Sequence, residues 1–186
     1  MNKIVSTISF LLLINTCLMS QANIDFNPKS LKVELTKVNS KEVELKELSI
    51  APELAGNIRL GKFYSITNQS FSLTKYVYIG RINTCRAGGC SIKQNTKTNQ
   101  DSEFFDYFIF FDANASIQLV KIFNYQASHG QEVTATSWLK QFKNYDGKKE
   151  LVVGKNVDAI SGATISVDAT SLDIEHKTKL LKKILQ

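Results

Sequence analysis

Cysteine, histidine and proline are scarce in this chain of 186 residues, which contains three, two and two of them respectively. A structural zinc site needs four ligands, most often Cys and His, and so few scattered residues do not supply that set. Covalent attachment of a c-type haem needs the pattern Cys-x-x-Cys-His, which the sequence lacks. The composition therefore argues against both zinc and haem.

Several signatures of catalysis are also missing. The sequence shows no Ser/His/Asp triad pattern, no clustered pair of carboxylates and no Gly-rich loop of the nucleotide-hydrolase type. It has no low-complexity segment and no clear internal repeat, so we expect one globular domain after processing.

The first 22 residues are typical of a secretory signal. Lys3 supplies the positive start, Ile8–Ile14 is an apolar run, and Ser20–Ala22 has small residues where a signal peptidase cleaves. The apolar run is too short to span a membrane. A lipidated Cys17 is the alternative, although the three residues before it form a poor lipobox. Either way, we expect the domain in the periplasm or on the extracytoplasmic face of the membrane.

Two cysteines, Cys85 and Cys90, remain in the single mature domain of residues 23–186. An oxidising compartment, an even number and a short spacing make a disulfide the default interpretation. Arg86 lies beside Cys85 and could favour its thiolate, so a redox-active dithiol stays open as the alternative.

The formal net charge is +6, and much of the excess comes from Lys177, Lys179, Lys182 and Lys183. We expect these lysines on the solvated face of a C-terminal helix, where His176 would also have a surface role. An exported protein without basic residues interleaved with aromatic ones is not expected to bind nucleic acid. The alternative use of this charge is contact with an acidic redox partner or with anionic lipid.

Alternating apolar residues and β-branched or aromatic runs predict a series of strands. The hydrophobic runs at 104–111 and 117–125, joined by a polar turn, predict a β-hairpin. The other expected strands are two short ones within 31–48, then 61–66, 71–82 and a brief one at 151–153.

Helical spacing predicts a short helix around Trp138 that ends near residue 143, a helical turn within 50–60, and a last helix over 166–185. The fold class is therefore α+β, with a mainly antiparallel sheet packed by two or three helices. The expected buried residues of the last helix are Val167, Leu172, Ile174, Leu181 and Ile184.

The stretch from Asp158 to Thr164 lies just before this last helix. Gly162 and Ala163 are small enough to let a bulky group approach the backbone. Free N–H groups at a helix start bind anions, and the Thr164 hydroxyl could carry a phosphate covalently. The alternative is an ordinary turn with a Ser/Thr helix cap.

The seven residues match the pattern Asp-x-x-Ser/Thr-Gly-Ala-Thr/Ser of the FMN-binding domain family. That family includes the flavin-carrying subunits of sodium-translocating NADH:quinone oxidoreductases and of related ferredoxin-linked complexes. The chain resembles the family most over 104–174. The resemblance implies that Thr164 carries FMN through a phosphoester bond, and that a flavin transferase installs it from FAD with Mg²⁺. The residues implied as the recognition motif are Asp158, Ser161, Gly162 and Ala163.

A turn that follows the predicted hairpin contains His129, Gly130 and Glu132. Family members have a glycine-containing turn with an acidic residue at a comparable place, so the resemblance implies that these residues lie near the flavin. The chain lacks the Glu-Thr-Pro-Gly-Leu-Gly form of the respiratory subunits, and the correspondence is one of position only. An ordinary strand-to-helix turn is the alternative.

Four aromatic residues near these stretches could stack on a flavin ring or belong to the core, which is the commoner role at helical spacing. They are Tyr125, Trp138, Phe142 and Tyr145.

Taken together, these features predict an exported electron carrier with covalent FMN, which passes electrons between a membrane redox complex and an extracytoplasmic acceptor. Such a protein is an electron-transfer protein rather than an enzyme with its own substrate. The alternatives are a binding or structural module of the same fold without flavin, and a thiol–disulfide protein that uses Cys85 and Cys90.

Overall fold

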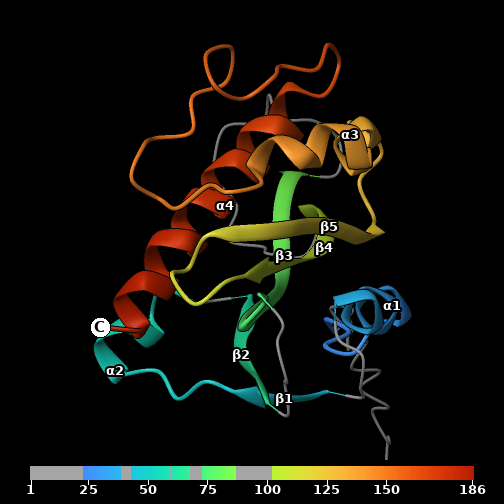
Figure 1. The fold of residues 1–186 in the computed structure, drawn as a ribbon. Helices are drawn as coiled ribbons and strands as arrows, with labels where there is room; N and C mark the ends of the chain where they lie inside the picture. Colours follow the sequence, from blue (N-terminus) through green and yellow to red (C-terminus); the bar gives the residue numbers. More distant parts are fainter. Residues whose placement is uncertain (1–22, 39–42, 59, 68–72, 87–101) are drawn as a thin grey trace, which may run out of the picture.

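A five-stranded antiparallel sheet lies at the centre of the molecule (Figure 1). The computed structural model describes residues 23–38, 43–58, 60–67, 73–86 and 102–186. Neighbours in the sheet follow the order of the chain, β1-β2-β3-β4-β5. The strands are β1 (Glu44–Glu47), β2 (Gly61–Thr67), β3 (Tyr76–Arg86), β4 (Ser102–Phe111) and β5 (Ile117–Tyr125).

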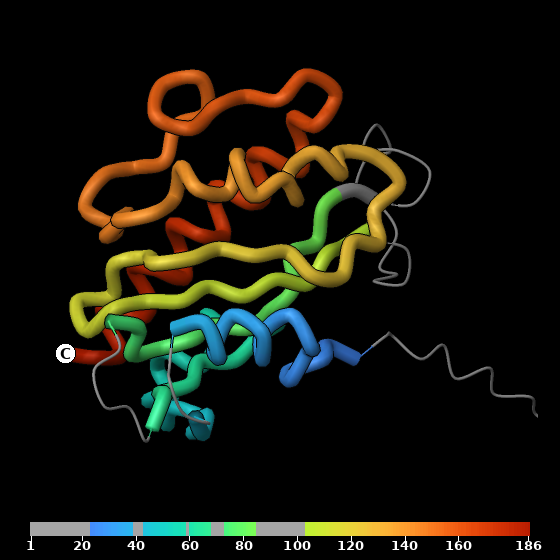
Figure 2. Tube along the Cα trace, turned by 45° about the vertical axis from the view of Figure 1, so that its right-hand side comes forward, coloured from blue at the N-terminus to red at the C-terminus, as the bar shows by residue number. Residues whose placement is uncertain are grey.

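Helices cover both faces of this sheet, which confirms the predicted α+β fold. The long C-terminal helix α4 (Thr164–Ile184) crosses one face, and α1 (Lys29–Val38) lies on the other (Figures 1 and 2). The shorter helices are α2 (Pro52–Ala55), η1 (Gln131–Thr134), α3 (Thr136–Leu139) and η2 (Lys140–Phe142). As predicted, α4 begins at the Asp158–Thr164 motif.

The alternation of side chains along β4 divides the apolar interior into two clusters, because successive residues point to opposite faces. Phe105, Tyr107 and Ile109 belong to the cluster on the α4 face, with Val167 and Ile174 of the helix. The residues between them serve the α1 face, where Phe108 and Phe110 pack with Leu31 and Leu35. Strand β4 is therefore buried on both sides.

The β4–β5 hairpin is confirmed, with Phe110 opposite Leu119 in the register. Its turn is held by the Asp112 carboxylate, which accepts hydrogen bonds from the N–H groups of Asn114 and Ser116, each at 2.8 Å. A short aspartate that bonds the backbone two residues on is a common turn device.

Two of the predicted strands are wrong. The first of the two strands placed in 31–48 is helix α1, because Leu31 and Leu35 are buried at the i, i+4 spacing of a helix while Val33 is 52% exposed. Leu31 and Leu35 fit both the strand and the helix period, so the sequence pattern was ambiguous there. Residues 151–153 form no strand either; they belong to a loop in which the Val152 N–H donates to Asn156 Oδ1 at 2.7 Å.

The buried face of α4 is more polar than predicted. Val167, Ile174 and Leu181 are buried as expected, but Leu172 is 67% exposed and Lys177 is only 5% exposed. Three buried hydroxyl residues each donate to the carbonyl four residues earlier, which lets them lie in the core. They are Thr170, Ser171 and Thr178. Because polar residues occupy these buried positions, the apolar residues of the sequence do not by themselves identify the buried face of the helix.

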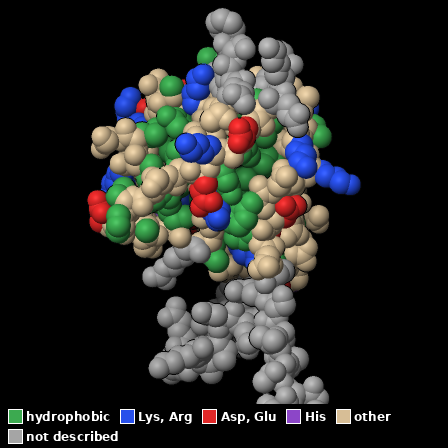
Figure 3. All heavy atoms as spheres, turned by 90° about the horizontal axis from the view of Figure 1, so that it is seen from below, with side chains coloured by type: hydrophobic (Ala, Val, Ile, Leu, Met, Phe, Trp, Pro, Cys, Tyr) green, Lys and Arg blue, Asp and Glu red, His purple; other side chains and the backbone are tan. Residues whose placement is uncertain are grey.

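The described surface mixes charges of both signs. Seen from below, Lys and Arg side chains lie next to Asp and Glu among hydrophobic ones (Figure 3). Across the described ranges, no helix has both the length and the apolar character that a membrane crossing requires.

Candidate functional site

The motif residues form an exposed loop that leads into α4. Thr164 is the first residue of the helix, and its side chain is exposed, as are Ser161 and Gly162. Gly162 has φ +80°, a left-handed conformation that favours glycine, and no atom of the described residues lies within 4 Å of where its Cβ would be. Ala163, in contrast, is buried and anchors the loop. The loop is thus open at Gly162, and Thr164, two residues later, is exposed to solvent.

The start of α4 offers backbone donors. The helical hydrogen bonds of α4 begin with the backbone N–H of Val167, which donates to the Ala163 carbonyl at 2.9 Å. The N–H groups of Thr164, Ile165 and Ser166 precede that bond and lie at the positive end of the helix dipole. Ala163 is the N-cap residue and provides no side-chain cap. The alternative of a Ser/Thr cap is therefore not what the described structure shows.

Two hydrogen bonds fix the beginning of the motif loop to the preceding helices. Trp138 Nε1 donates to the Asp158 carbonyl at 2.8 Å, and the Asp158 N–H donates to Gln141 Oε1 at 2.7 Å. Gln141 is itself held, because its Nε2 donates to the Trp138 carbonyl at 2.8 Å. The Asp158 side chain remains exposed. Sequence analysis missed Gln141, and a single polar residue in a short helix gives no signal of such a role.

The turn around Gly130 packs against the first turn of α4, although the two are far apart in the chain. Gly130 has φ +82°, and a Cβ there would lie 2.5 Å from Ser166 Oγ. Tyr125 joins the two segments: its hydroxyl donates to the His129 carbonyl at 2.5 Å and lies 3.2 Å from Ser166 Oγ. The structure thus brings together the two stretches that the sequence singled out, His129–Gly130 and the start of the last helix.

The charged residues of this turn face solvent. His129 and Glu132 are exposed, and His129 Nδ1 lies 3.1 Å from the Ser128 hydroxyl, which also donates to Glu103. Burial raises the pKa of Tyr125, partly offset by its hydrogen bond with Ser166, and the Glu103 and Glu132 carboxylates raise it further. The Tyr125 phenol therefore stays protonated at neutral pH and remains a donor.

The four aromatic candidates divide into core and partly exposed residues. Trp138 is only 8% exposed and packs edge-on against Phe142, with ring centroids 5.2 Å apart. Trp138 therefore braces the motif loop from the core. Tyr125 stacks on Phe105 at 5.3 Å and is half-buried, and Tyr145 donates to the Lys149 carbonyl at 2.7 Å. Only Tyr125 and Tyr145 offer part of a ring to the surface.

The predicted disulfide lies outside the described residues, because Cys90 falls in 87–101 and the side chain of Cys85 is not described. Within the described residues, no group of three or more His, Cys, Asp or Glu side chains could hold a metal ion. The arrangement around Thr164 is instead suited to an anion: an accessible hydroxyl, adjacent backbone donors and the positive end of a long helix.

Comparisons with known proteins add no family to this picture: no family model matches the chain, and no curated protein matches it in sequence. The resemblance to FMN-binding domains therefore rests on the Asp158–Thr164 motif and on the position of the Gly130 turn.

Proposed function

We propose that this protein is an exported electron carrier with FMN attached to Thr164 through a phosphoester bond. One observation carries the proposal. Thr164 is exposed at the first residue of α4, two residues after Gly162, which has the left-handed conformation and open space where its Cβ would be. A covalent phosphate needs both that accessible oxygen and that room.

The residues present fit a phosphate group. The N–H groups that open α4 would bind its oxygens, and the helix dipole favours its negative charge. Gly162 leaves the backbone open to the approach of a flavin transferase, with Asp158 and Ser161 also exposed in the loop that Ala163 anchors. Trp138 holds the loop in place through the Asp158 carbonyl.

The turn at His129 and Gly130 contacts the first turn of α4 at Ser166. His129 could donate to a flavin carbonyl or to the phosphate, and Glu132 would set the local charge. FMN, once attached, supplies the electron-transfer chemistry, while the chain positions it and sets its surroundings.

Export explains why the link is covalent, because a dissociated flavin would diffuse away outside the cell. Maturation needs a flavin transferase that uses FAD and Mg²⁺: the Thr164 oxygen would attack the phosphorus on the FMN side of the FAD pyrophosphate, the P–O–P bond would break, and AMP would leave. The working partners are then a membrane redox complex and an exported redox protein. We assign no substrate of its own to the protein.

The test is flavinylation in cells that co-express the full chain with an active flavin transferase. The intact mass should rise by one FMN less water, and the denatured band should fluoresce. Thr164→Val should lose both signals. Thr136→Val is a matched control, because Thr136 is also an exposed residue that opens a helix, and it should keep both.

Absence of an adduct on the wild-type chain, with the transferase active on another substrate, would overturn the proposal. It would favour a binding or structural module of the same fold. Replacement of Cys85 and Cys90 by Ser tests the thiol–disulfide alternative, since a redox dithiol predicts that this change abolishes electron transfer rather than only lowering stability.

A further inference from the structure

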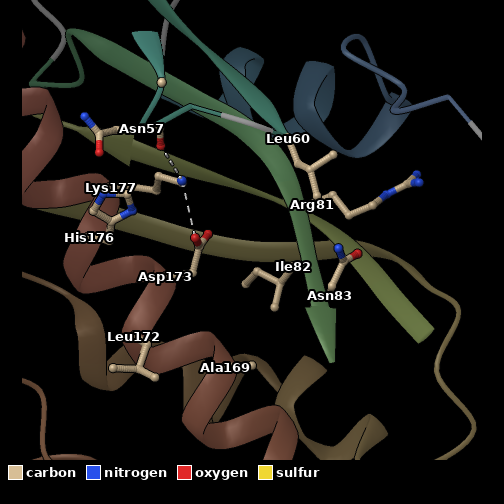
Figure 4. Close-up of a pocket in the computed structure, with 11 residues that line it drawn as sticks. Asn57, Leu60, Arg81, Ile82, Asn83, Ala169, Leu172, Asp173, His176 and Lys177 are labelled. Carbon is tan, nitrogen blue, oxygen red and sulfur yellow. Dashed lines mark hydrogen bonds and ion pairs between the residues drawn. The ribbon is translucent and has the colours of Figure 1, made fainter. Parts of the chain in front are cut away.

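A cleft of about 580 Å³ opens between α4, β3 and the segment after α2 (Figure 4). Its volume is within the range of roughly 300–1,000 Å³ that small-molecule sites occupy. Ile82 of β3 and Ala169 and Leu172 of α4 give it apolar walls. Asp173, His176 and Lys177 of the same helix supply polar groups.

Two glycines make room for an aromatic ring next to the cleft. Gly61 of β2 and Gly80 of β3 are directly opposite in the register. The Tyr78 ring lies across both, because a Cβ on either glycine would come within 2.2 Å or 2.3 Å of the Tyr78 hydroxyl oxygen. The buried Tyr78 ring fills the space of the two missing side chains, and Lys177 Nζ, which lines the cleft, lies 5.5 Å from the centre of this ring.

A loosely held charge pair lines the cleft. Lys177 Nζ is 3.4 Å from Asp173 Oδ1 and 3.4 Å from the Asn57 carbonyl oxygen. Figure 4 shows Lys177 and Asp173 directed toward each other from successive turns of α4. Asp173 also accepts a hydrogen bond from the buried Tyr107 hydroxyl. Burial, with the Asp173 charge, raises the pKa of Tyr107, so Tyr107 remains a donor at neutral pH.

This pair has hydrogen-bonding capacity to spare. An ammonium group has three donors and a carboxylate about four acceptor positions. Both Lys177 contacts are long for an N–H···O bond, whose usual length is about 2.7–3.2 Å. Lys177 is nevertheless only 5% exposed, so water has little access to it. A buried cation with long contacts is suited to a further acceptor.

The charges around the cleft balance. Lys177 and Asp173 cancel each other, and burial, together with the Lys177 charge, lowers the pKa of His176, which is neutral at pH 7. Arg81 contributes no free charge, because its side chain extends away from α4 and pairs with Asp106 at 2.6 Å (Figure 4). An anion would meet Asp173 and a cation would meet Lys177. A neutral ligand avoids both repulsions.

We propose that this cleft binds a neutral, planar heterocycle that carries an amide or imide edge. Its carbonyl oxygen accepts from Lys177, its ring N–H donates to Asp173, and its faces pack against Leu172, Ala169 and Ile82. This site lies beyond the start of α4 and does not require a flavin on Thr164.

Riboflavin is a suitable probe, because it is neutral and its ring has an imide edge. We would titrate it into the full chain made without flavin transferase and follow the quenching of riboflavin fluorescence. Lys177→Met and Asp173→Asn should each weaken binding by about 10-fold or more, the usual effect of a lost hydrogen bond to a charged group. Lys179→Met is the matched control, because Lys179 is on the same helix and pairs with Glu175 outside the cleft. It should bind riboflavin as the wild type does.

Two further arms keep the proposal open to refutation if a buried variant fails to fold. Leu172→Ser changes an exposed residue and should fold, yet lower affinity through the lost apolar contact. Riboflavin methylated at the imide nitrogen lacks the donor for Asp173 and should bind wild type about 10-fold more weakly. Equal binding of both probes, or no binding of riboflavin, would overturn the proposal.

Repetition with the flavinylated chain identifies the source of the ligand. If riboflavin still binds the flavinylated chain, the cleft takes a free ligand. If the flavinylated chain no longer binds riboflavin, the flavin ring attached to Thr164 occupies the cleft. Both outcomes require the cleft to recognise the imide edge, and both differ from failure of Thr164 to become flavinylated.

Discussion

Each face of the sheet carries a charge pair, and the two pairs differ in burial and in geometry. On the α1 face, Arg81 and Asp106 form a two-point contact at 2.6 and 3.0 Å, and Asn124 donates to the same carboxylate at 2.8 Å. On the α4 face, Lys177 and Asp173 are 3.4 Å apart beside an open cleft. A closed, satisfied pair serves the fold, whereas a loose pair at a cavity keeps capacity for a ligand.

The same division applies to the rest of the molecule. The α1 face is a packed interior, in which the guanidinium of Arg81 also lies 3.6 Å from the centre of the Phe104 ring. The α4 face carries the motif loop, the Gly130 turn and the cleft. Changes on the α1 face should therefore alter stability, and changes on the α4 face should alter flavinylation or binding.

The largest expected effect is on the α1 face, with Asp106→Asn. The variant keeps the shape of the side chain but removes the carboxylate charge that compensates the buried Arg81 guanidinium, which is 5% exposed. Removal of one partner from a buried pair costs about 3–5 kcal/mol, which urea unfolding would measure. Lys62→Met breaks an exposed pair with Glu47 and should change stability far less. A loss for Asp106→Asn no larger than that of the control would contradict the contrast between the faces.

Gly130→Ala comes next, on the α4 face. The new Cβ would lie 2.5 Å from Ser166 Oγ, and the alanine would have to adopt φ +82°, which is strained for a residue with a side chain. We therefore expect the free energy of unfolding to fall by about 1–3 kcal/mol and flavinylation to be slower. Gly154→Ala separates the two causes, because Gly154 has the same φ and no atom of the described residues within 4 Å. If both variants flavinylated at equal rates, contact between the Gly130 turn and α4 would have no part in the site.

Trp138→Phe should have a smaller effect, confined to the motif loop. It keeps an aromatic ring in the core but removes the donor to the Asp158 carbonyl, which is worth about 1 kcal/mol. Hydrogen exchange should become faster at residues 158–164 and stay unchanged in β4. Uniformly faster exchange would show instead that the ring serves only the core.

The smallest effect concerns Glu175, on the outer side of α4. Burial alone would raise its pKa, but hydrogen bonds from Lys179 and from the Leu151 N–H lower it below the usual 4.5. The unfolded chain then binds the proton first as the pH falls, so this contribution is present above about pH 4.5 and is lost below it. Glu175→Gln should flatten the fall in stability there, as measured by urea unfolding at several pH values. Parallel profiles for the two proteins would contradict this.

The sequence predicted those elements whose pattern is unambiguous. The β4–β5 hairpin has long aromatic runs and a polar turn, and α4 follows a recognisable motif. Helix α1 was mistaken for a strand because Leu31, Val33 and Leu35 alternate as they would in a strand. Leu31 and Leu35 are also four residues apart, which is the spacing of one face of a helix. Burial of Leu31 and Leu35 against the sheet favours the helix, and this tertiary contact cannot be read from a single sequence.

The site was predicted in part. The placement of Thr164 at the start of the last helix followed from the motif, but the contact between Gly130 and Ser166 depends on tertiary packing. Lys177 was expected in solvent, because a lysine in a lysine-rich segment usually lies there. Its burial depends on contacts with Asn57 and Tyr78, which are distant in the chain, beside the local pair with Asp173.

Gly61, Gly80 and Tyr78 act as one unit, which has an evolutionary consequence. A larger residue at either glycine would force the aromatic ring out of its place, so a tolerated change there should be accompanied by a smaller residue at position 78. Relatives of this chain that retain this packing should therefore vary at these three positions together, and relatives with a smaller residue at position 78 should be free to vary at each glycine alone.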